Sequence, residues 1–443
     1  ESYRSLDADE DTDTMWTALG WMFASALATA LGNSLDAISI FAIFHPFLLV
    51  VAFAKLHNQI SKQQNKLQGW NLDYLVVCFI TIAFHACAVT VGFAGLFSYP
   101  TTTFLSVCTT FVIGLLCWTV MVFLILLPSH SIVNRFPSWP VSPFVFSVLY
   151  VATSVTLIGH FISTYPSIGN AVLDIAPLRA LSSLFGLAGI EFIVVLPGSV
   201  LALFYLDPSR PTFRAAAMTT AVIAAGALAV GGFLNVSERF YQRNATDLLP
   251  ATTIPASCIF SQDVLKGKAW DATLEATAAR VAAGDKIVLW SELAVLVADP
   301  EEEADLLSKA AAAGGGQAYV GVTYELKADK DGRTTNRFAL VTPQGDVAWN
   351  YAKAYPVPVI EAEITPGPPV MPFHESPFGK MTGAICFDLD HPQFIRQASA
   401  GGALLLLQPS WTWGAVGARH MEDNALRAAE NGLTILRCSS DGF

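Results

Sequence analysis

Charged residues are scarce in this chain, and their scarcity limits its fold class. Only 14% of the 443 residues are Asp, Glu, Lys or Arg, whereas about a quarter are charged in a typical soluble domain. Hydrophobic residues make up 53% of the chain, and the mean hydropathy is +0.48. This composition excludes an ordinary soluble enzyme and predicts membrane-spanning segments.

Basic residues are the scarcer of the two charge types. Against 36 Asp and Glu there are only 25 Lys and Arg, so the formal net charge is −11. A protein that binds nucleic acid neutralises phosphates with clustered Lys and Arg. The sequence therefore argues against nucleic acid as a partner.

The cysteines and histidines also show little of the spacing that marks disulfide frameworks or metal sites. The seven cysteines are an odd number, and their spacing reveals no disulfide framework. His85 and His160 stand alone without metal-ligand spacing, and we expect both to be packed, hydrogen-bonded residues. Four cysteines lie in apolar runs, where we expect packing roles: Cys78, Cys87, Cys108 and Cys117. The sequence thus predicts no metal site and no cofactor.

Seven apolar runs follow an acidic N-terminal tail. Residues 1–14 are mostly acidic and polar, as in a solvated tail. The runs that follow each approach the ~20 apolar residues that cross a bilayer, and the first is the shortest. Their approximate bounds are 15–31, 34–55, 73–97, 103–127, 142–163, 178–205 and 214–234. We predict a helical membrane domain over residues 15–235.

Cations mark one side of this predicted membrane domain. The connections that an alternating chain places on the N-terminal side carry, on or beside them, Lys55, Lys62, Lys66, Arg135, Arg210 and Arg214. The opposite connections contain no Lys or Arg, although Arg179 lies just beyond the last of them. By the positive-inside rule the N-terminus is cytosolic, and seven spans place the later residues on the extracytoplasmic face, periplasmic or lumenal. This conclusion depends on the count of seven.

Two polar features of the membrane half have alternative interpretations. Glu191 lies in the middle of a predicted span, where a charge is costly, so a functional or pairing role is expected, and the alternative is a protonated or snorkelling carboxyl near a helix interface. The triplet Asn244-Ala245-Thr246 follows the last span and is a candidate glycosylation site. If Asn244 is used, the membrane belongs to a eukaryotic secretory pathway.

Residues 236–443 have a different character from the membrane half. Short runs of β-forming residues alternate there with Ala-rich amphipathic runs. Strands are expected at 256–260, 286–290, 318–324, 337–342, 347–352 and 403–408, and helices at 273–283, 305–313, 391–400 and 417–431. The stretch 383–389 is interpreted as a buried strand that delivers a thiol at its end. This alternation predicts an α/β domain with helices covering the sheet.

Three reactive side chains terminate predicted strands of this domain. Glu292 stands just past the strand 286–290, Lys353 ends the strand 347–352, and the stretch 383–389 presents Cys386. Rigid sheets commonly present functional groups to a cleft in this way. Each residue alone is more often an ordinary surface or core residue. Together, in the order Glu, Lys, Cys, they point to nucleophilic catalysis by a thiol.

This ordered set resembles the nitrilase superfamily, and most closely its membrane-embedded branch, the apolipoprotein N-acyltransferases. The resemblance covers most of the chain and includes the apolar spans ahead of the catalytic domain. It implies an αββα sandwich behind a polytopic helical domain. The motifs that carry it are Lys266-Gly267-Lys268-Ala269-Trp270, Trp290-Ser291-Glu292, the run from Lys353 through Val357-Pro358 to Glu361, Cys386-Phe387-Asp388 and Arg427-Ala428-Ala429-Glu430-Asn431-Gly432.

The chemistry of a thiol nucleophile gives the three residues their expected roles. A free thiol has a pKa near 8.5, so only a small fraction is thiolate at neutral pH and activation is needed. Glu292 would act as general base, and Lys353 would favour the thiolate and then the oxyanion of the tetrahedral intermediate. Cys386 would hold the acyl group as a thioester.

Some positions support or depart from the family pattern. Glu361 matches the family's second glutamate, which is expected to orient the lysine or the cleft. Phe387 and Asp388 stand where bacterial members usually have Tyr and Glu, and Ser291 stands where they usually have Pro. These differences leave open which acceptor the protein recognises. The family continues after residues 439–443 with further strands and a final span, so we expect these to be missing here.

The sequence therefore predicts a membrane N-acyltransferase. A phospholipid would donate an acyl chain to Cys386, which passes it to an amine such as the N-terminal cysteine of a lipoprotein. The alternative is a membrane-tethered amidase or nitrilase-type hydrolase that uses the same residues with water as acceptor. A third possibility, a non-catalytic membrane scaffold, is disfavoured because Glu292, Lys353 and Cys386 are all present.

Overall fold

The structure is a computed structural model in which the chain forms two compact units, Glu1–Arg239 and Phe240–Phe443. The boundary lies close to the one expected at residue 235. The described residues are 14–34, 37–64, 72–93, 103–159, 163–164, 167–248, 253–260, 270–327, 333–358, 360–412 and 415–440. The acidic tail, His160 and most of the motif 266–270 lie outside these ranges.

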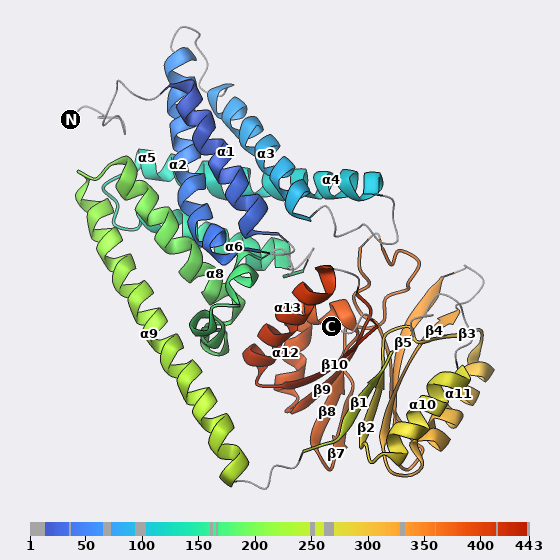
Figure 1. Ribbon diagram of the computed structural model, residues 1–443. Helices are drawn as coiled ribbons and strands as arrows, with labels where there is room; N and C mark the ends of the chain where they lie inside the picture. The colour runs from blue at the N-terminus through green and yellow to red at the C-terminus, as the bar shows by residue number, and fades with distance from the viewer. Residues whose placement is uncertain are drawn as a thin grey trace. The chain divides into compact units, whose positions relative to one another are not determined.

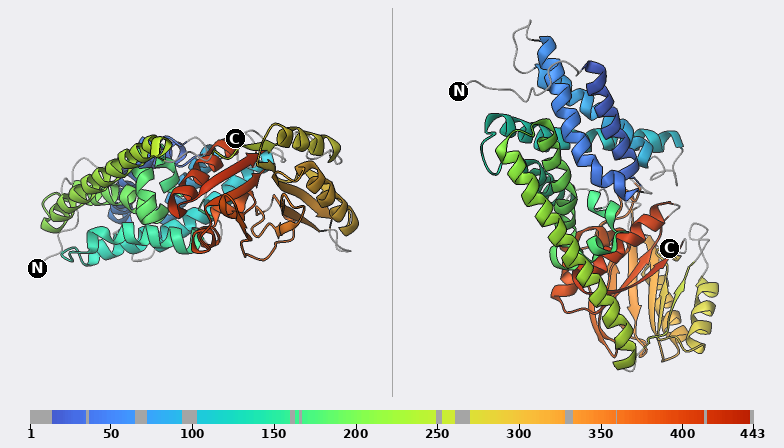
Figure 2. Two further views of the ribbon diagram at one scale, coloured as in Figure 1. Left: turned by 90° about the horizontal axis from the view of Figure 1, so that it is seen from below. Right: turned by 60° about the vertical axis from the view of Figure 1, so that its left-hand side comes forward.

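The first unit is helical (Figure 1). In its described ranges, six helical segments are long and apolar enough to cross a membrane. They are α1 (Met15–Gly32), α2 (Ser39–Gln64), α3 (Leu72–Phe93), α4 (Thr103–Met121) continued through the π-helical turn η1 (Val122–Leu126) into α5 (Leu127–Arg135), α8 (Ala176–Leu206) and α9 (Pro211–Leu248). The helix α9 is the longest, with 38 residues, and Figure 2 shows it as one unbroken rod. The prediction of a polytopic helical domain is therefore confirmed.

The run expected to be a span at 142–163 forms a shorter helix instead. It consists of η2 (Ser142–Phe144), α6 (Val145–Thr153) and the π-helical η3 (Ser154–Ile158), with the apolar part ending at Leu157. This length is below the ~20 residues that cross a bilayer. The segment runs antiparallel to α8, since Ser147 Oγ lies 2.8 Å from Ser199 Oγ and Ser154 donates to Glu191 at 2.7 Å.

Several polar side chains inside the helical unit are hydrogen-bonded to one another. The carboxylate of Glu191 accepts hydrogen bonds from Ser154 at 2.7 Å and from Ser167 at 2.5 Å. Ser167 also caps the 3-10 helix η4 (Ile168–Val172) by accepting from the Gly169 amide. Glu191 thus has the pairing role that was one of its two expected roles. His85 is packed and hydrogen-bonded to Ser25 as expected.

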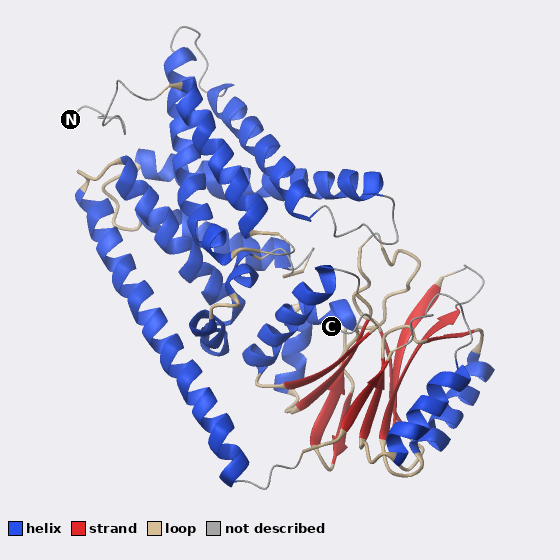
Figure 3. Cartoon of the chain, in the orientation of Figure 1, coloured by secondary structure: helices blue, strands red, loops and turns tan. Residues whose placement is uncertain are grey.

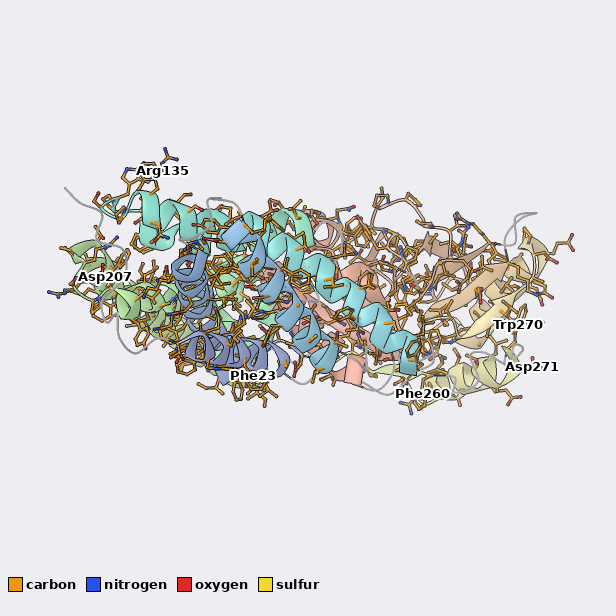
Figure 4. All side chains as sticks on the ribbon, turned by 90° about the horizontal axis from the view of Figure 1, so that it is seen from above. Phe23, Arg135, Asp207, Phe260, Trp270 and Asp271 are labelled. Carbon is orange, nitrogen blue, oxygen red and sulfur yellow. A yellow bond between two sulfur atoms is a disulfide. The ribbon has the colours of Figure 1, made fainter. Side chains whose placement is uncertain are left out.

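Both ends of the segment 135–207 lie at the same end of the helical unit. Figure 4 shows the Arg135 and Asp207 side chains together there, while Phe23 projects from the side of α1. The hydroxyl of Thr212 donates to the Pro137 carbonyl at 2.9 Å. The chain that leaves α5 therefore returns to the same end of the helical unit before α9 begins. Phe23 is 62% exposed, as expected of a side chain that faces lipid rather than water.

The second unit contains two β-sheets. The larger sheet has the order β1-β2-β4-β5-β6, with β3 beside β4, and the smaller has the order β10-β9-β8-β7. The strands of the larger sheet are β1 (Ala256–Ile259), β2 (Ile287–Trp290), β3 (Val295–Val297), β4 (Tyr319–Lys327), β5 (Thr334–Val341) and β6 (Val347–Ala352). Those of the smaller sheet are β7 (Phe373–Ser376), β8 (Gly379–Gly383), β9 (Leu405–Ser410) and β10 (Thr434–Ser439).

Helices cover both outer faces of these sheets (Figure 3). The larger sheet carries α10 (Trp270–Ala282) and α11 (Pro300–Gly314), and the smaller carries α12 (Pro392–Ala400) and α13 (Ala415–Asn431). One apolar cluster joins the inner faces of the sheets, with Phe338 and Trp349 from one meeting Met381 and Leu406 from the other. This is the αββα sandwich that the sequence predicted.

The strand β2 shows why the sequence folds into a central strand here. Its four residues are all buried, as in strands covered on both faces. Successive side chains point to opposite faces, so Leu289 enters the core between the sheets while Trp290 packs in the helix-covered layer. Trp290 donates to the Thr277 hydroxyl of α10 at 2.9 Å. These contacts fix the direction of the chain after β2, and with it the position of Glu292.

The expected strand at 383–389 is wrong in its bounds. The strand β8 ends at Gly383, and residues 386–390 form the 3-10 helix η5 (Cys386–Asp390). A side chain at Gly383 would place a Cβ 2.5 Å from Phe338, so the backbone approaches the opposite sheet too closely for any other residue. Beyond Gly383 the chain turns away from the sheet, which puts Cys386 in a turn and not on a strand.

A disulfide joins the two sheets. Cys258 in β1 is bonded to Cys438 in β10, and each strand lies at an edge of its sheet. The sequence spacing gave no sign of this pair, because 180 residues separate its members. The other five cysteines are free thiols. The disulfide closes one side of the sandwich covalently.

Removing this disulfide is expected to destabilise the second unit. Replacing Cys258 and Cys438 with alanine should lower the free energy of unfolding by about 2–5 kcal/mol, because the crosslink restricts the unfolded chain. Denaturant unfolding of the full chain in detergent measures the loss. A Cys87→Ala variant, which removes an exposed free thiol from α3, serves as the control. Equal unfolding midpoints for the double variant and the control would contradict the prediction.

Candidate active site

Cys386 occupies a sharp turn directly after the smaller sheet. Its φ angle is +44°, in the left-handed region that side chains with a Cβ seldom adopt. The turn is closed by two hydrogen bonds, in which the Ile385 amide donates to the Asp388 carboxylate at 2.9 Å and the Asp388 amide donates to the Ile385 carbonyl at 3.0 Å. Strained backbone of this kind is often found where a nucleophile must project from a sheet.

Glu292 follows the end of β2 and is almost fully buried. Its Oε1 accepts from Asn336 Nδ2 at 2.7 Å and from Lys353 Nζ at 2.8 Å, and its Oε2 accepts from the Trp411 amide at 2.7 Å. These three donors come from two strands of the larger sheet and from the end of β9. The carboxylate is therefore held in a single orientation.

Lys353 lies between two carboxylates. Besides Glu292, its ammonium donates to both oxygens of Glu361, at 2.8 and 2.7 Å. Lys353 is 1% exposed, and burial alone would lower its pKa. The charges of Glu292 and Glu361 outweigh burial and hold the pKa of Lys353 well above its ordinary value. The lysine is therefore a fixed cation beside the thiol.

Glu361 anchors the loop that follows Lys353. Its Oε2 accepts from the Val357 amide at 2.6 Å, in addition to the contacts with Lys353. Burial raises the pKa of Glu361, and the Lys353 cation opposes that rise. Glu361 therefore contacts the lysine directly, and its role in orienting the lysine or the cleft stays a prediction.

The Cys386 thiol lies among groups from three elements. Its Sγ accepts from Ser410 Oγ at 3.3 Å and lies 3.7 Å from the Trp411 carbonyl. Burial raises the pKa of the thiol, and the Glu292 carboxylate raises it further, while Lys353 and Arg437 lower it. Without a proton acceptor the thiol would stay protonated at neutral pH.

Asp388 connects the cysteine turn to the lysine loop. It accepts from the amides of Ile385 and Tyr355, at 2.9 and 2.8 Å, and from the Tyr351 hydroxyl at 2.8 Å. Burial raises the pKa of Asp388 to about 7, against the lowering effect of Lys353 and of these donors. Asp388 therefore positions the turn and is not a candidate for direct chemistry.

The raised pKa of Asp388 makes folding stability depend on pH. An acid whose pKa is higher in the folded state stabilises the fold fully below its unfolded pKa, and this contribution is lost as the pH rises through 7. We expect the free energy of unfolding to fall between about pH 4 and pH 7, by at most ~1.4 kcal/mol per pH unit for this group. Asp388→Asn should flatten that slope in denaturant titrations of the full chain. An unchanged slope in Asp388→Asn would contradict the assignment.

Three aromatic rings lie together beside the turn that holds Cys386. The Phe387 ring meets the His391 ring edge-on at 5.3 Å, and Tyr355 stacks on His391 at 3.9 Å. Phe387 and Tyr355 are both partly exposed. They offer an apolar surface next to the nucleophile where a substrate group can pack.

The structure thus brings most of the predicted site residues together. Glu292, Lys353 and Glu361 are in direct contact, and their charges act on Cys386 from the neighbouring turn. Asn244 lies within α9 and far along the chain from this group, and its side chain is outside the described part. In the described ranges no three His, Cys, Asp or Glu side chains gather as metal ligands would.

Sequence reasoning missed several members of the site. Asn336 and Trp411 orient Glu292, and Gln408 donates to the Cys386 carbonyl at 3.1 Å. His420 lies near the thiol as well, and Asp390 lies near His420. Asp390 is two residues beyond the Cys386-Phe387-Asp388 motif, so its position along the chain offered a signal. The others lie in strands and a helix whose side chains meet the thiol only in three dimensions.

Comparisons with known proteins found matches for the second unit. Residues 266–442 match the profile of the family described as carbon-nitrogen hydrolase. Among solved structures, a mutant of the amidase from Nesterenkonia sp. AN1, a member of the nitrilase superfamily, is 20% identical, with a TM-score of 0.37, covering 43% of this chain and 78% of that chain.

A second mutant of the same amidase is 19% identical, with a TM-score of 0.37, and covers 43% of this chain and 77% of that chain. In that protein the acetamide moiety of fluoroacetamide is covalently added to the active site cysteine. No curated protein sequence matches this chain. Residues 266–442 therefore match the carbon-nitrogen hydrolase family, in a chain whose described residues also include six long apolar helices.

Proposed function

We propose that this protein is a membrane N-acyltransferase. It moves a fatty acyl chain from a phospholipid, through a thioester on Cys386, to an amine such as the N-terminal cysteine of a lipoprotein. The observation that carries the proposal is the joint presence of a buried Glu292-Lys353 pair beside a strained cysteine and of six helices fit to lie in a bilayer. A hydrolase of small soluble amides has no need of such helices.

The first half-reaction consumes the phospholipid. The Cys386 sulfur attacks the ester carbonyl, so a carbon–sulfur bond forms and a tetrahedral oxyanion appears. Lys353, a fixed cation, stabilises that oxyanion, as donors of this kind do by roughly 3–4 kcal/mol. The carbon–oxygen ester bond then breaks, and the lysophospholipid leaves after its alkoxide takes up the proton that the thiol lost on attack. Cys386 is left as a thioester.

The second half-reaction consumes the amine. A neutral amine attacks the thioester carbonyl, the carbon–nitrogen bond forms and the carbon–sulfur bond breaks. Glu292 is placed to take the proton that the amine loses, because its carboxylate is buried and held next to Lys353. The proton then returns to the thiolate, which restores Cys386.

Two features support an extracytoplasmic location for the second unit. The short helix at 142–158 runs antiparallel to α8, so the chain that leaves the Arg135 end returns to that end before α9 begins. The basic residues Arg135 and Arg210 then share one side, which the positive-inside rule makes cytosolic. The single further pass of α9 leads to the opposite face.

The disulfide is an independent support for the same side. A bond between Cys258 and Cys438 persists in oxidising compartments such as the periplasm or the secretory pathway and is rare in the cytosol. The proposed location therefore follows from helix packing and from cysteine chemistry separately.

The proposal is tested by incubating the full chain, in vesicles, with a phospholipid labelled in its acyl chain. We expect intact mass measurement to show an increase equal to one acyl group, released by hydroxylamine as a thioester should be. Adding a peptide with an N-terminal cysteine should then yield labelled peptide. Turnover of small amides without lipid would instead favour the hydrolase, and a silent protein in both assays would favour a scaffold.

A further inference from the structure

An apolar cavity lies between the helices α8 and α9 of the first unit. Its volume is about 320 Å³, which falls within the range of ~300–1,000 Å³ that is usual for ligand pockets. Its walls come from residues between 181 and 193 of α8 and between 223 and 230 of α9, and none of them has a polar side chain. The acyl-transfer steps proposed for Cys386 do not involve this cavity.

Glycines open the cavity, and contacts between the two helices close both of its ends. Gly186 interrupts α8 with a φ of 63° and a ψ of −173°, far from helical values. Gly226 of α9 leaves space, since a Cβ built there would meet no atom within 4 Å. At one end the backbones touch, because a Cβ at Gly231 would lie 2.1 Å from the Pro177 carbonyl oxygen. At the other end the helices share an apolar cluster formed by Leu196, Val200 and Ala216.

The dimensions of the cavity suit an acyl chain better than a helix. At 1.5 Å per residue the wall from Leu181 to Ile193 is roughly 18 Å long, and half of the hydrocarbon core of a bilayer is ~15 Å thick. A further helix is about 10 Å across, so it cannot enter between two helices that meet at both ends of the gap. Phe185 and Ile223 are 58% and 41% exposed, so the cavity opens sideways to the surrounding hydrocarbon. A single acyl chain is therefore the occupant that fits.

A cation stands next to this wall, at the end of α8 where the helix begins. Arg179 lies two residues before Leu181, in the first turn of α8, and is exposed. The connections between spans on this side of the membrane contain no Lys or Arg, as the positive-inside rule leads one to expect, so a cation kept here calls for a role. The nearest acidic residue along the chain, Asp174, accepts from the Ser39 hydroxyl at 2.6 Å. The positive end of the helix dipole adds to the attraction for an anion, and a bilayer offers phosphate at the level where a span begins.

We propose that the cavity between α8 and α9 binds one phospholipid of the extracytoplasmic leaflet. An acyl chain fills the space between the helices, and the phosphate binds the Arg179 guanidinium at the start of α8. The binding is non-covalent and needs no reaction at Cys386. It rests on the proposed function only for the side of the membrane on which the lipid lies.

The test is photocrosslinking of the full chain in phosphatidylcholine vesicles. A trace of phosphatidylcholine carries a diazirine in its acyl chain, and mass spectrometry identifies the labelled peptides. We expect label at 181–193 and at 223–230. Gly226→Leu should lower this label by about tenfold, because the new side chain takes up the space of the acyl chain. Gly232→Leu is the matched control on α9, since its Cβ also meets no atom within 4 Å but Gly232 does not line the cavity.

A second pair of variants tests the phosphate contact. Arg179→Gln should lower the label from phosphatidylcholine by about tenfold, as expected when a hydrogen bond to a charged group is lost. A diacylglycerol with the same diazirine chain has no phosphate, so its label should be unchanged by Arg179→Gln. Arg214→Gln, at an exposed position near the start of α9, is the control. Thermal unfolding in detergent checks that each variant is folded.

Four outcomes would overturn the inference. Label that avoids both peptides in the wild type, wild-type label in Gly226→Leu, or an equal loss in Gly232→Leu would remove the acyl-chain site. Equal effects of Arg179→Gln on the two lipids would remove the phosphate contact. Crosslinked dimers in place of lipid label would assign the cavity to a second copy of the chain and count as the first of these outcomes. Labelling should be the same in Cys386→Ala, so a failure of acyl transfer is distinguishable from a failure of lipid binding.

Discussion

Cys386→Ala is expected to abolish both acyl capture and acyl transfer. Without the sulfur there is no atom in the turn that can form a thioester, so the labelled phospholipid should add no mass to the protein. In the described part of the chain, Cys386 is the cysteine that Ser410 contacts and on which the charges of Glu292 and Lys353 act, which makes the effect specific. We expect the loss to reach the detection limit in the intact-mass assay.

The fold should tolerate this substitution. Alanine is smaller than cysteine and leaves the hydrogen bonds of the turn, which involve the backbone and Asp388, in place. Denaturant unfolding should therefore show only a small change. Cys117→Ala in α4 is the matched control, because it removes a free thiol from the other unit. A labelled adduct that persists in Cys386→Ala would contradict the thioester mechanism.

Lys353→Met is expected to damage both stability and chemistry. The substitution leaves Glu292 and Glu361 buried without their shared cation, and breaking a buried ion pair typically costs about 3–5 kcal/mol. It also removes the charge that favours the thiolate and the oxyanion, so thioester formation should slow by about 10²–10³-fold. Because the pKa of Lys353 is raised well above its ordinary value, both effects should be present in full at neutral pH.

A second substitution separates these two effects. In Lys353→Met with Glu361→Gln, one of the orphaned carboxylates becomes neutral, so part of the lost stability should return. The rate should not return, because the cation is still absent. Denaturant midpoints and thioester rates for the single and double variants form a double-mutant cycle, with an expected coupling of about 0.5–3 kcal/mol. If the stability lost in the double variant equals the sum of the losses in the two single variants, the inferred coupling between Lys353 and Glu361 is wrong.

The elements that the sequence predicted well are those with local signals. The strand β2 is a continuous apolar run, and α11 was expected at 305–313 but begins at Pro300, after the Asp299 cap that the sequence-based prediction did not use. Gly432 ends α13 with a φ of +62°, as the Asn431-Gly432 pair indicated. Such signals depend on residues a few positions apart, so they are visible in a single chain.

The features that the sequence did not reveal depend on long-range contacts. The strand bounds around Cys386 were wrong because the limit is set by Phe338, in another sheet, against Gly383. The Cys258–Cys438 pair and the place of His420 follow from the docking of one sheet on the other and of α13 on η5. No periodicity in the chain encodes these distances. Pattern and spacing therefore located the reactive residues but not the groups that orient them.

The left-handed backbone at Cys386 implies a conflict between folding and reactivity. Glycine is the residue that this φ angle suits best, and a residue with a Cβ is held there at a cost of roughly 1–3 kcal/mol. The turn is thus less stable with cysteine than it would be with glycine. Selection for heat resistance alone would drive this position toward glycine, so only the need for a nucleophile can keep it occupied by cysteine.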